Sequence, residues 1–146
     1  MSPSCPAAEA RGRFAAARVA RLATADAAGR PHLVPVVFAV SQEAVYSVVD
    51  AKPKRTLALR RLANVAENPH VALLVDHYDD RDWGALWWVR AEGVARVLDP
   101  ASAVEAERAE ASHAVQLLRE RYPQQQAVGL VLAVGVERWS GWTASG

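Results

Sequence analysis

The chain of 146 residues is 51% hydrophobic and carries 17 basic against 16 acidic residues, a formal net charge of +1. A chain of this length can bury one hydrophobic core, which predicts a single domain over residues 1–146. The balanced charge provides no overall attraction to nucleic acid, so electrostatic recognition must come from local clusters.

Few features of the sequence indicate a cellular compartment or a metal site. Cys5 is the only cysteine and cannot form an internal disulfide, and the four histidines show no metal-ligand spacing. The first residues lack the charged start and apolar core of a signal peptide, and no apolar run approaches the ~20 residues of a membrane span. We therefore expect a cytoplasmic protein with no metal, membrane or nucleic-acid partner.

The first half of the chain predicts one helix and three strands. Residues from about 6 to 17 are rich in Ala, Arg and Glu, which favours a short N-terminal helix. Residues 19–25 and 31–40 predict a hairpin around a turn at 26–29, in which Gly29 can adopt positive φ. Pro35 has no N–H for a ladder, so it marks an edge or a bulge. Residues 44–50 predict the third strand.

The second half predicts two helices and three strands. Pro53 fits the first position of a helix that ends at Asn68-Pro69. Residues 70–76 are nearly continuously apolar and predict a strand buried on both faces. Residues 83–98 predict a long strand bent at Gly93. Asp99-Pro100 predicts the N-cap and first position of a helix that ends at Pro123, and residues 128–139 predict the last strand.

The order of these elements indicates the fold class. Strands dominate, and they do not alternate with helices as in a doubly wound sheet. The sequence predicts a mainly β (α+β) protein, a six-stranded antiparallel split β-barrel with flanking helices.

A basic segment at residues 50–56, DAKPKRT, lies at a predicted strand-to-helix junction. If Pro53 begins the helix, the next backbone N–H groups are free to bind an anion. Lys52, Lys54 and Arg55 add positive charge, and the Thr56 hydroxyl adds a donor. This combination suits a phosphate ester, although a solvated turn would also place cations here.

The ordered motifs resemble a known family. Residues 21–24, 26–29 and 30–36 (RPHLVPV) resemble the opening of pyridoxamine-phosphate-oxidase-like split-barrel flavoproteins. Residues 50–55, 61–65, 68–76, 83–93 and 138–142 are similar to the actinobacterial branch that uses the deazaflavin coenzyme F420. The resemblance covers about residues 18–144. The chain lacks the C-terminal arginine-bearing signature of true pyridoxamine-phosphate oxidases, which argues against a pyridoxal substrate.

This resemblance implies a function and a set of site residues. It implies a homodimer with cofactor sites at the subunit interface, and hydride transfer from reduced F420 to an unsaturated or oxidised small-molecule substrate. The phosphate would bind Lys52, Lys54, Arg55 and Thr56. The deazaflavin ring would lie along the second strand, near His32, Val34, Pro35, Val36 and Val37. An FMN-dependent enzyme and a non-catalytic flavin- or haem-binding module remain alternatives.

The tryptophans and possible proton donors are weaker candidates. Adjacent Trp87 and Trp88 must face opposite sides of a strand. We expect one in the core, and we assign Trp88 to the cofactor ring, with plain interface packing as the alternative. His32 and Tyr78 could donate protons, but a hydrogen-bonded histidine and a solvated loop are the usual outcomes. No catalytic residue is assigned, since a redox coenzyme carries the hydride itself.

Overall fold

The computed structural model describes residues 4–50, 55–125 and 129–145. These residues form seven strands, three α-helices and one 3-10 helix, η1. In chain order the elements are α1 Ala7–Ala16, β1 Ala20–Ala25, β2 Pro31–Val36, β3 Ala39–Ser41, β4 Ala44–Asp50, α2 Arg55–Glu67, β5 His70–His77, η1 Trp83–Ala85, β6 Trp87–Leu98, α3 Glu105–Arg121 and β7 Gly129–Thr143.

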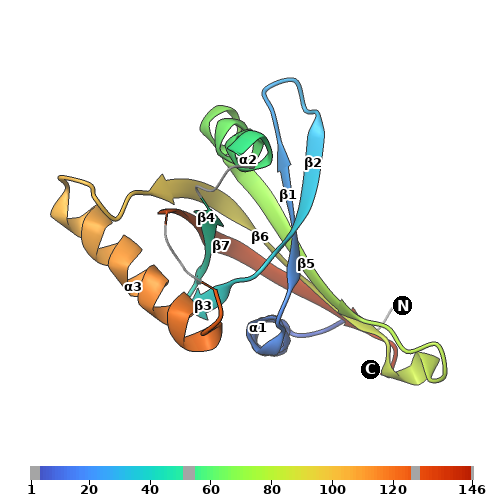
Figure 1. Ribbon diagram of the computed structural model, residues 1–146. Coiled ribbons are helices and arrows are strands. Elements are labelled where there is room, and N and C mark those ends of the chain that lie inside the picture. The colour runs from blue at the N-terminus through green and yellow to red at the C-terminus, as the bar shows by residue number, and fades with distance from the viewer. Residues whose placement is uncertain (1–3, 51–54, 126–128, 146) are drawn as a thin grey trace.

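One antiparallel sheet carries the fold. Its strand order is β2-β1-β5-β6-β7-β4-β3, so β2 and β3, which follow one another in the chain, are the two edges. The sheet curls into a split barrel with α2 beside β1 and α3 along the β3–β4 side, while α1 lies at the opposite end from α2 (Figure 1). The predicted split barrel and its flanking helices are confirmed.

The expected count of six strands is wrong, because the predicted strand 31–40 is two strands. β2 ends at Val36 and pairs with β1, whereas β3 begins at Ala39 and pairs with β4. Between them the Phe38 side chain is completely buried. The chain therefore leaves one edge of the barrel, places Phe38 in the core and starts the other edge.

The start of α3 also differs from its prediction. α3 begins at Glu105, and the residues after Asp99 form a turn in which Asp99 Oδ1 accepts the N–H of Ala101 over 2.8 Å. Asp99 thus caps a turn and not the helix. The bend predicted at Gly93 is confirmed by a register shift between Glu92 and Gly93.

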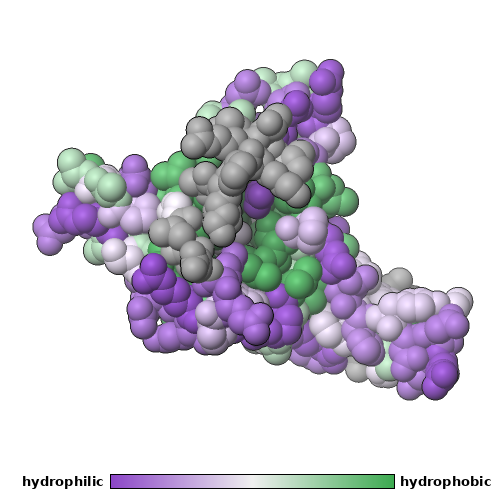
Figure 2. All heavy atoms as spheres, in the orientation of Figure 1, coloured by the Kyte–Doolittle hydropathy of each residue, from purple (hydrophilic) through white to green (hydrophobic). Residues whose placement is uncertain are grey.

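Two hydrophobic clusters fill the barrel and its flank. The larger contains Phe14 of α1, Phe38 and residues of the central strands, and the smaller lies under α3 around Leu118. The Phe14 ring packs 4.8 Å from Phe38 and 5.4 Å from Trp139, measured between ring centroids. Apolar residues gather in the middle of the face shown in Figure 2, with hydrophilic residues around them.

β5 is buried on only one face, which corrects the expectation of burial on both. Val71, Leu73 and Val75 point into the core, whereas Leu74 between them is 38% exposed. The outward face of β5 is thus available for another molecule. It forms part of the candidate site.

Candidate functional site

The register aligns the outward side chains of the neighbouring strands in rows. Arg21 of β1 pairs with Pro35 on one side and Leu74 on the other, and Leu74 pairs with Arg90. Arg90 pairs with Ser140 of β7, which completes a row across β2, β1, β5, β6 and β7. In the next row Trp88 pairs with Asp76 on one side and with Trp142 on the other.

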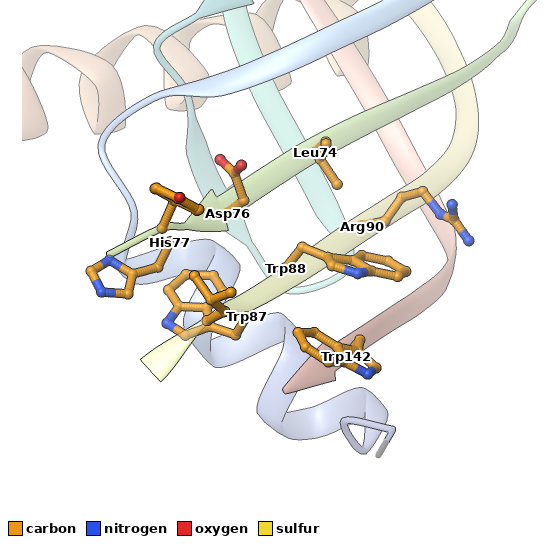
Figure 3. A pocket seen from close by; sticks show the side chains of 9 residues that line it. Leu74, Asp76, His77, Trp87, Trp88, Arg90 and Trp142 are labelled. Carbon is orange, nitrogen blue, oxygen red and sulfur yellow. The ribbon is translucent and has the colours of Figure 1, made fainter. Parts of the chain in front are cut away.

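A cleft of about 440 Å³ opens over the second row and the adjoining hairpin. Its lining comes from the ends of β5, β6 and β7 and from the segment that joins β5 to β6 (Figure 3). The lining residues are Leu74, Asp76, His77, Tyr78, Leu86, Trp87, Trp88, Arg90 and Trp142. Such a mostly aromatic wall with a few polar groups is typical of a small-molecule site.

The two adjacent tryptophans lie on opposite sides of β6, as predicted. Trp87 packs against the larger core cluster, stacks with the His77 ring at 6.1 Å and has the Arg13 guanidinium 5.1 Å from its ring. Trp88 faces outward beside Trp142, its partner in the register. Figure 3 shows the Trp88 indole beside Arg90, with the Trp142 indole further along the cleft.

Arg90 sits against the outward tryptophan. Its guanidinium carbon lies 5.2 Å from the centroid of Trp88, a cation–π contact. Its Nε atom lies 2.9 Å from Glu92 Oε1. The same Nε is buried without a hydrogen bond of acceptable direction, so the Glu92 contact is an ion pair and not a directed hydrogen bond.

β2 is an edge strand, as Pro35 predicted. Pro35 and Leu33 point outward, and Leu33 is 66% exposed. Val34 and Val36 pack with the core, so only their backbone is open at the edge, and Val37 lies just beyond the strand. The His32 side chain is half-buried, and its Nε2 atom is buried without a hydrogen-bond partner.

The basic segment is only partly described. Lys52 and Lys54 lie outside the described residues, while Arg55 and Thr56 open α2. The first turn of α2 has no acidic residue. Further along this helix, burial lowers the pKa of Arg61.

Within one chain, the predicted residues do not form a single pocket. The cleft contains Trp88 but no residue of β2 or α2. β6 and β2 are three strand spacings apart in the sheet, about 14 Å along a flat sheet at about 4.8 Å per spacing. Sequence reasoning missed Arg90 and Trp142 as site residues. The period-two pattern of Trp88 and Arg90 on one strand face could have indicated the first.

A second polar cluster lies on the opposite side of the fold, between α3 and the β3–β4 hairpin. The Tyr46 hydroxyl donates to Glu110 Oε2 over 2.8 Å, and Arg96 Nη2 contacts both oxygens of Glu110, at 2.8 and 2.7 Å. Ser41 Oγ lies 3.3 Å from His113 Nε2. Burial, with Glu110 nearby, raises the pKa of Tyr46 to about 12.

The described part of the chain contains neither a membrane-spanning helix nor a metal-binding cluster. No helix there combines the length and the apolar character that a membrane crossing requires. No three His, Cys, Asp or Glu side chains among residues 4–50, 55–125 and 129–145 gather into a possible metal site.

The topology and the cleft define a split-barrel protein with an aromatic cleft on the outer face of its sheet. Residues 7–143 match the family model described as pyridoxamine 5'-phosphate oxidase. The chain therefore belongs to this family.

A curated relative from Streptomyces rimosus is a 5a,11a-dehydrotetracycline/5a,11a-dehydrooxytetracycline reductase. It is 36% identical over 78 residues, which are 53% of this chain and 54% of the relative. The match thus spans about half the length of the curated relative.

Two solved structures share the fold. An FAD-binding protein from Mesorhizobium loti is 22% identical with a TM-score of 0.66, over 97% of this chain and 95% of that one. The heme storage protein HutZ from Vibrio cholerae is 19% identical with a TM-score of 0.63, over 93% of this chain and 96% of that one. At these identities the likeness concerns the fold alone.

Proposed function

We propose that this protein is an oxidoreductase that uses reduced coenzyme F420 to transfer hydride to an unsaturated or oxidised organic substrate. The family is described by an oxidase, pyridoxamine 5'-phosphate oxidase, and the relative from Streptomyces rimosus is a reductase. Both support redox chemistry on this chain. Electron flow from coenzyme to substrate is the direction that the reductase favours.

The observation that carries the coenzyme assignment is the start of α2. This helix begins at Arg55, directly after Lys52 and Lys54 in the sequence, and has no acidic residue in its first turn. Free amides at a helix start attract phosphate, and neighbouring cations strengthen that attraction. We assign the coenzyme phosphate to Lys52, Lys54, Arg55 and Thr56.

The edge strand β2 fits the ring of the coenzyme. Pro35 donates no N–H to a neighbouring strand, and the other side of β2 from β1 is free of strand pairing among the described residues. The unpartnered Nε2 of His32 is a buried polar atom that a heteroaromatic ring could satisfy. We place the ring along His32, Val34, Pro35, Val36 and Val37, with the valines at positions 34 and 36 contributing through their backbone.

The coenzyme, when bound, supplies the hydride. The chain's own residues bind the phosphate, fix the ring against β2 and enclose the reacting face. No side chain is assigned as proton donor, since the reaction needs few catalytic side chains when the coenzyme carries the hydride.

A homodimer would complete the site. Trp88 and Pro35 of one chain are three strand spacings apart, and Leu33 and Leu74 expose apolar surface on the same outer face. Packing this face against its copy would bury that surface and would let the Trp88 of one chain approach the β2 edge of the other. We therefore propose interfacial coenzyme sites, with Trp88 against the ring bound by the other chain.

The test is a binding titration of coenzyme-stripped protein with F420 and, separately, with FMN. F420 should bind the more tightly. The double variant Lys54→Ala/Arg55→Ala should bind F420 at least about tenfold more weakly, since charge-assisted contacts to a phosphate contribute about 1.5–3 kcal/mol each. Arg60→Ala, which removes an exposed cation from the same helix, is the matched control and should bind normally.

Other outcomes have defined meanings. Unchanged F420 affinity in the double variant would contradict the phosphate assignment. Preference for FMN would make the protein a flavin-dependent enzyme of the same fold, an alternative supported by the FAD-binding neighbour. Ligand binding without turnover by any reductant would indicate a carrier, as the heme storage neighbour suggests.

A further inference from the structure

The aromatic cleft has a chemistry of its own. We propose that the corner formed by Trp88, Trp142 and Arg90 binds the electron-accepting substrate next to the coenzyme ring that we place at Trp88 from the other chain, and that this substrate is a planar conjugated molecule with a carboxylate or enolate oxygen. That this ligand is a substrate rests on the proposed function, whereas its chemical class is inferred from the residues that line the cleft.

Shape is the first argument. Trp88 and Trp142 are opposite one another on β6 and β7, and both are only partly exposed. Leu74 and Leu86 add aliphatic surface to the same lining. Indole faces favour offset stacking and edge contacts with flat rings, and rigid strands hold these two indoles in place. A planar ligand fits such a wall better than a flexible chain.

Charge is the second argument. Arg90 is held beside Trp88 by the cation–π contact and by the ion pair of its Nε with Glu92. Both contacts restrict the guanidinium before any ligand arrives. A planar, preorganised guanidinium suits a carboxylate or enolate better than a flexible ammonium would. In Figure 3 the Arg90 side chain runs past the Trp88 ring at one end of the cleft.

The position of Asp76 in the cleft indicates how the bound ligand is oriented. Asp76 of β5 pairs with Trp88 in the register and lines the same cleft. Figure 3 shows Asp76 on the other side of Trp88 from the Arg90 guanidinium. A carboxylate at one side repels a negatively charged oxygen, and a guanidinium at the other attracts it. The charged oxygen should therefore lie at Arg90, with the neutral part of the ring toward His77.

The experiment uses two probes of the same shape and different charge, 2-naphthoate and 2-naphthylmethanol. Calorimetry gives the affinities, and the indole N–H signals in NMR spectra locate the probe. 2-Naphthoate should bind at least about tenfold more tightly, and its titration should shift the signals of Trp88 and Trp142. Arg90→Met should abolish the preference for the anion while retaining 2-naphthylmethanol binding. Trp142→Leu should weaken both probes.

Two matched control variants distinguish binding in the cleft from binding elsewhere on the outer face of the sheet. Arg138→Met removes an arginine of β7 that pairs with Glu92 but does not line the cleft. Trp83→Leu removes a tryptophan that is 66% exposed and also outside the lining. Neither variant should change the affinity for 2-naphthoate. Circular dichroism of every variant checks that the fold is retained.

Repeating the titration with saturating F420 separates the substrate from the coenzyme. 2-Naphthoate should keep its affinity in the presence of F420. Competition between them would overturn the substrate assignment and give the cleft to the coenzyme. Equal affinities of the wild-type protein for the two probes would overturn the proposed ligand class. So would equal affinities of wild type and Arg90→Met for 2-naphthoate. Failure of F420 to bind while the probe pattern holds would contradict the proposed function and leave the ligand class supported.

Discussion

The side-chain amide of Asn64 donates a hydrogen bond to the Thr24 hydroxyl oxygen over 3.0 Å, and both residues are only 3% exposed. This bond joins α2 to β1 inside the protein. It therefore fixes the helix whose first turn we assign to the coenzyme phosphate.

Thr24→Val should destabilise the protein by about 1–3 kcal/mol, because it leaves a buried amide donor of Asn64 without its acceptor. The free energy of unfolding from urea titration measures the loss. The double variant Thr24→Val/Asn64→Leu removes both partners and should cost less than the sum of the single variants. Strictly additive losses would show that the two groups do not interact.

The aromatic hydroxyl of Tyr122 joins three segments. Its single O–H proton lies between the carbonyl oxygens of Arg18 and Phe38, each 3.0 Å from the hydroxyl oxygen, and that oxygen accepts a hydrogen bond from Arg121 Nε over 2.9 Å. Tyr122→Phe should lower the free energy of unfolding by about 1–3 kcal/mol, since these partners lose a shared hydrogen-bond group.

The matched control is Tyr78→Phe. Tyr78 is 62% exposed, and its hydroxyl donates to nearby Asp80. An exposed bond of this kind contributes little, so the loss should stay within about 0.5 kcal/mol. Equal losses in the two variants would contradict the structural role of Tyr122.

At Gly93 the backbone of β7 leaves no room for a side chain on β6. A Cβ atom at this position would lie 2.1 Å from the carbonyl oxygen of Gly135, a backbone atom that cannot rotate away. Gly93→Ala should therefore destabilise the protein by about 1–3 kcal/mol or more. Gly12 in α1 has no atom within 4 Å of its Cβ position. Gly12→Ala should stabilise by about 0.5–1 kcal/mol. Thermal unfolding of both variants tests the contrast, which a loss at Gly12 would contradict.

The Glu110 cluster predicts a pH dependence. Partial burial tends to raise the pKa of Glu110, but hydrogen bonds from Arg96 and Tyr46 outweigh it and lower the pKa below its usual value of 4.5. A lowered pKa in the folded state stabilises the protein above 4.5, and this stabilisation is lost as the pH falls through the lowered pKa.

Glu110→Gln should accordingly flatten the decline in unfolding free energy below pH 4.5. Urea titrations between pH 3 and pH 7 measure the difference from wild type. Glu105→Gln, an exposed position at the start of the same helix, should follow the wild-type curve. Parallel curves for wild type and Glu110→Gln would exclude the cluster as a source of acid sensitivity.

Local signals predicted the elements whose ends depend on neighbours in the sequence. The strand 44–50 and the bend at Gly93 were predicted correctly, because a turn and a glycine mark them. The division between β2 and β3 was missed, since Phe38 continues an apolar run and its burial depends on the barrel closing around it. Asp99-Pro100 misled the prediction of α3, because the same residues can cap a turn.

The site shows the same difference between local and long-range information. Pro35 revealed an edge strand because the missing N–H is a property of one residue. The pairing of Trp88 with Trp142 depends on the register of β6 against β7, which no local pattern contains. The cleft could therefore not be predicted as a unit, although the opposite faces of Trp87 and Trp88 could.

The outer face of the sheet predicts the assembly state. Leu74 and Leu33 are 38% and 66% exposed there. If two copies bury this face, Leu74→Asp should place a charge in the interface and produce monomers, because an unpaired buried charge is costly. Sedimentation equilibrium or light scattering gives the mass. Val104→Asp, at a residue 61% exposed beside α3, is the control and should leave the mass unchanged. F420 affinity should fall with the loss of dimer, since each site needs both chains. A monomeric wild type that still binds F420 tightly would contradict the interfacial site.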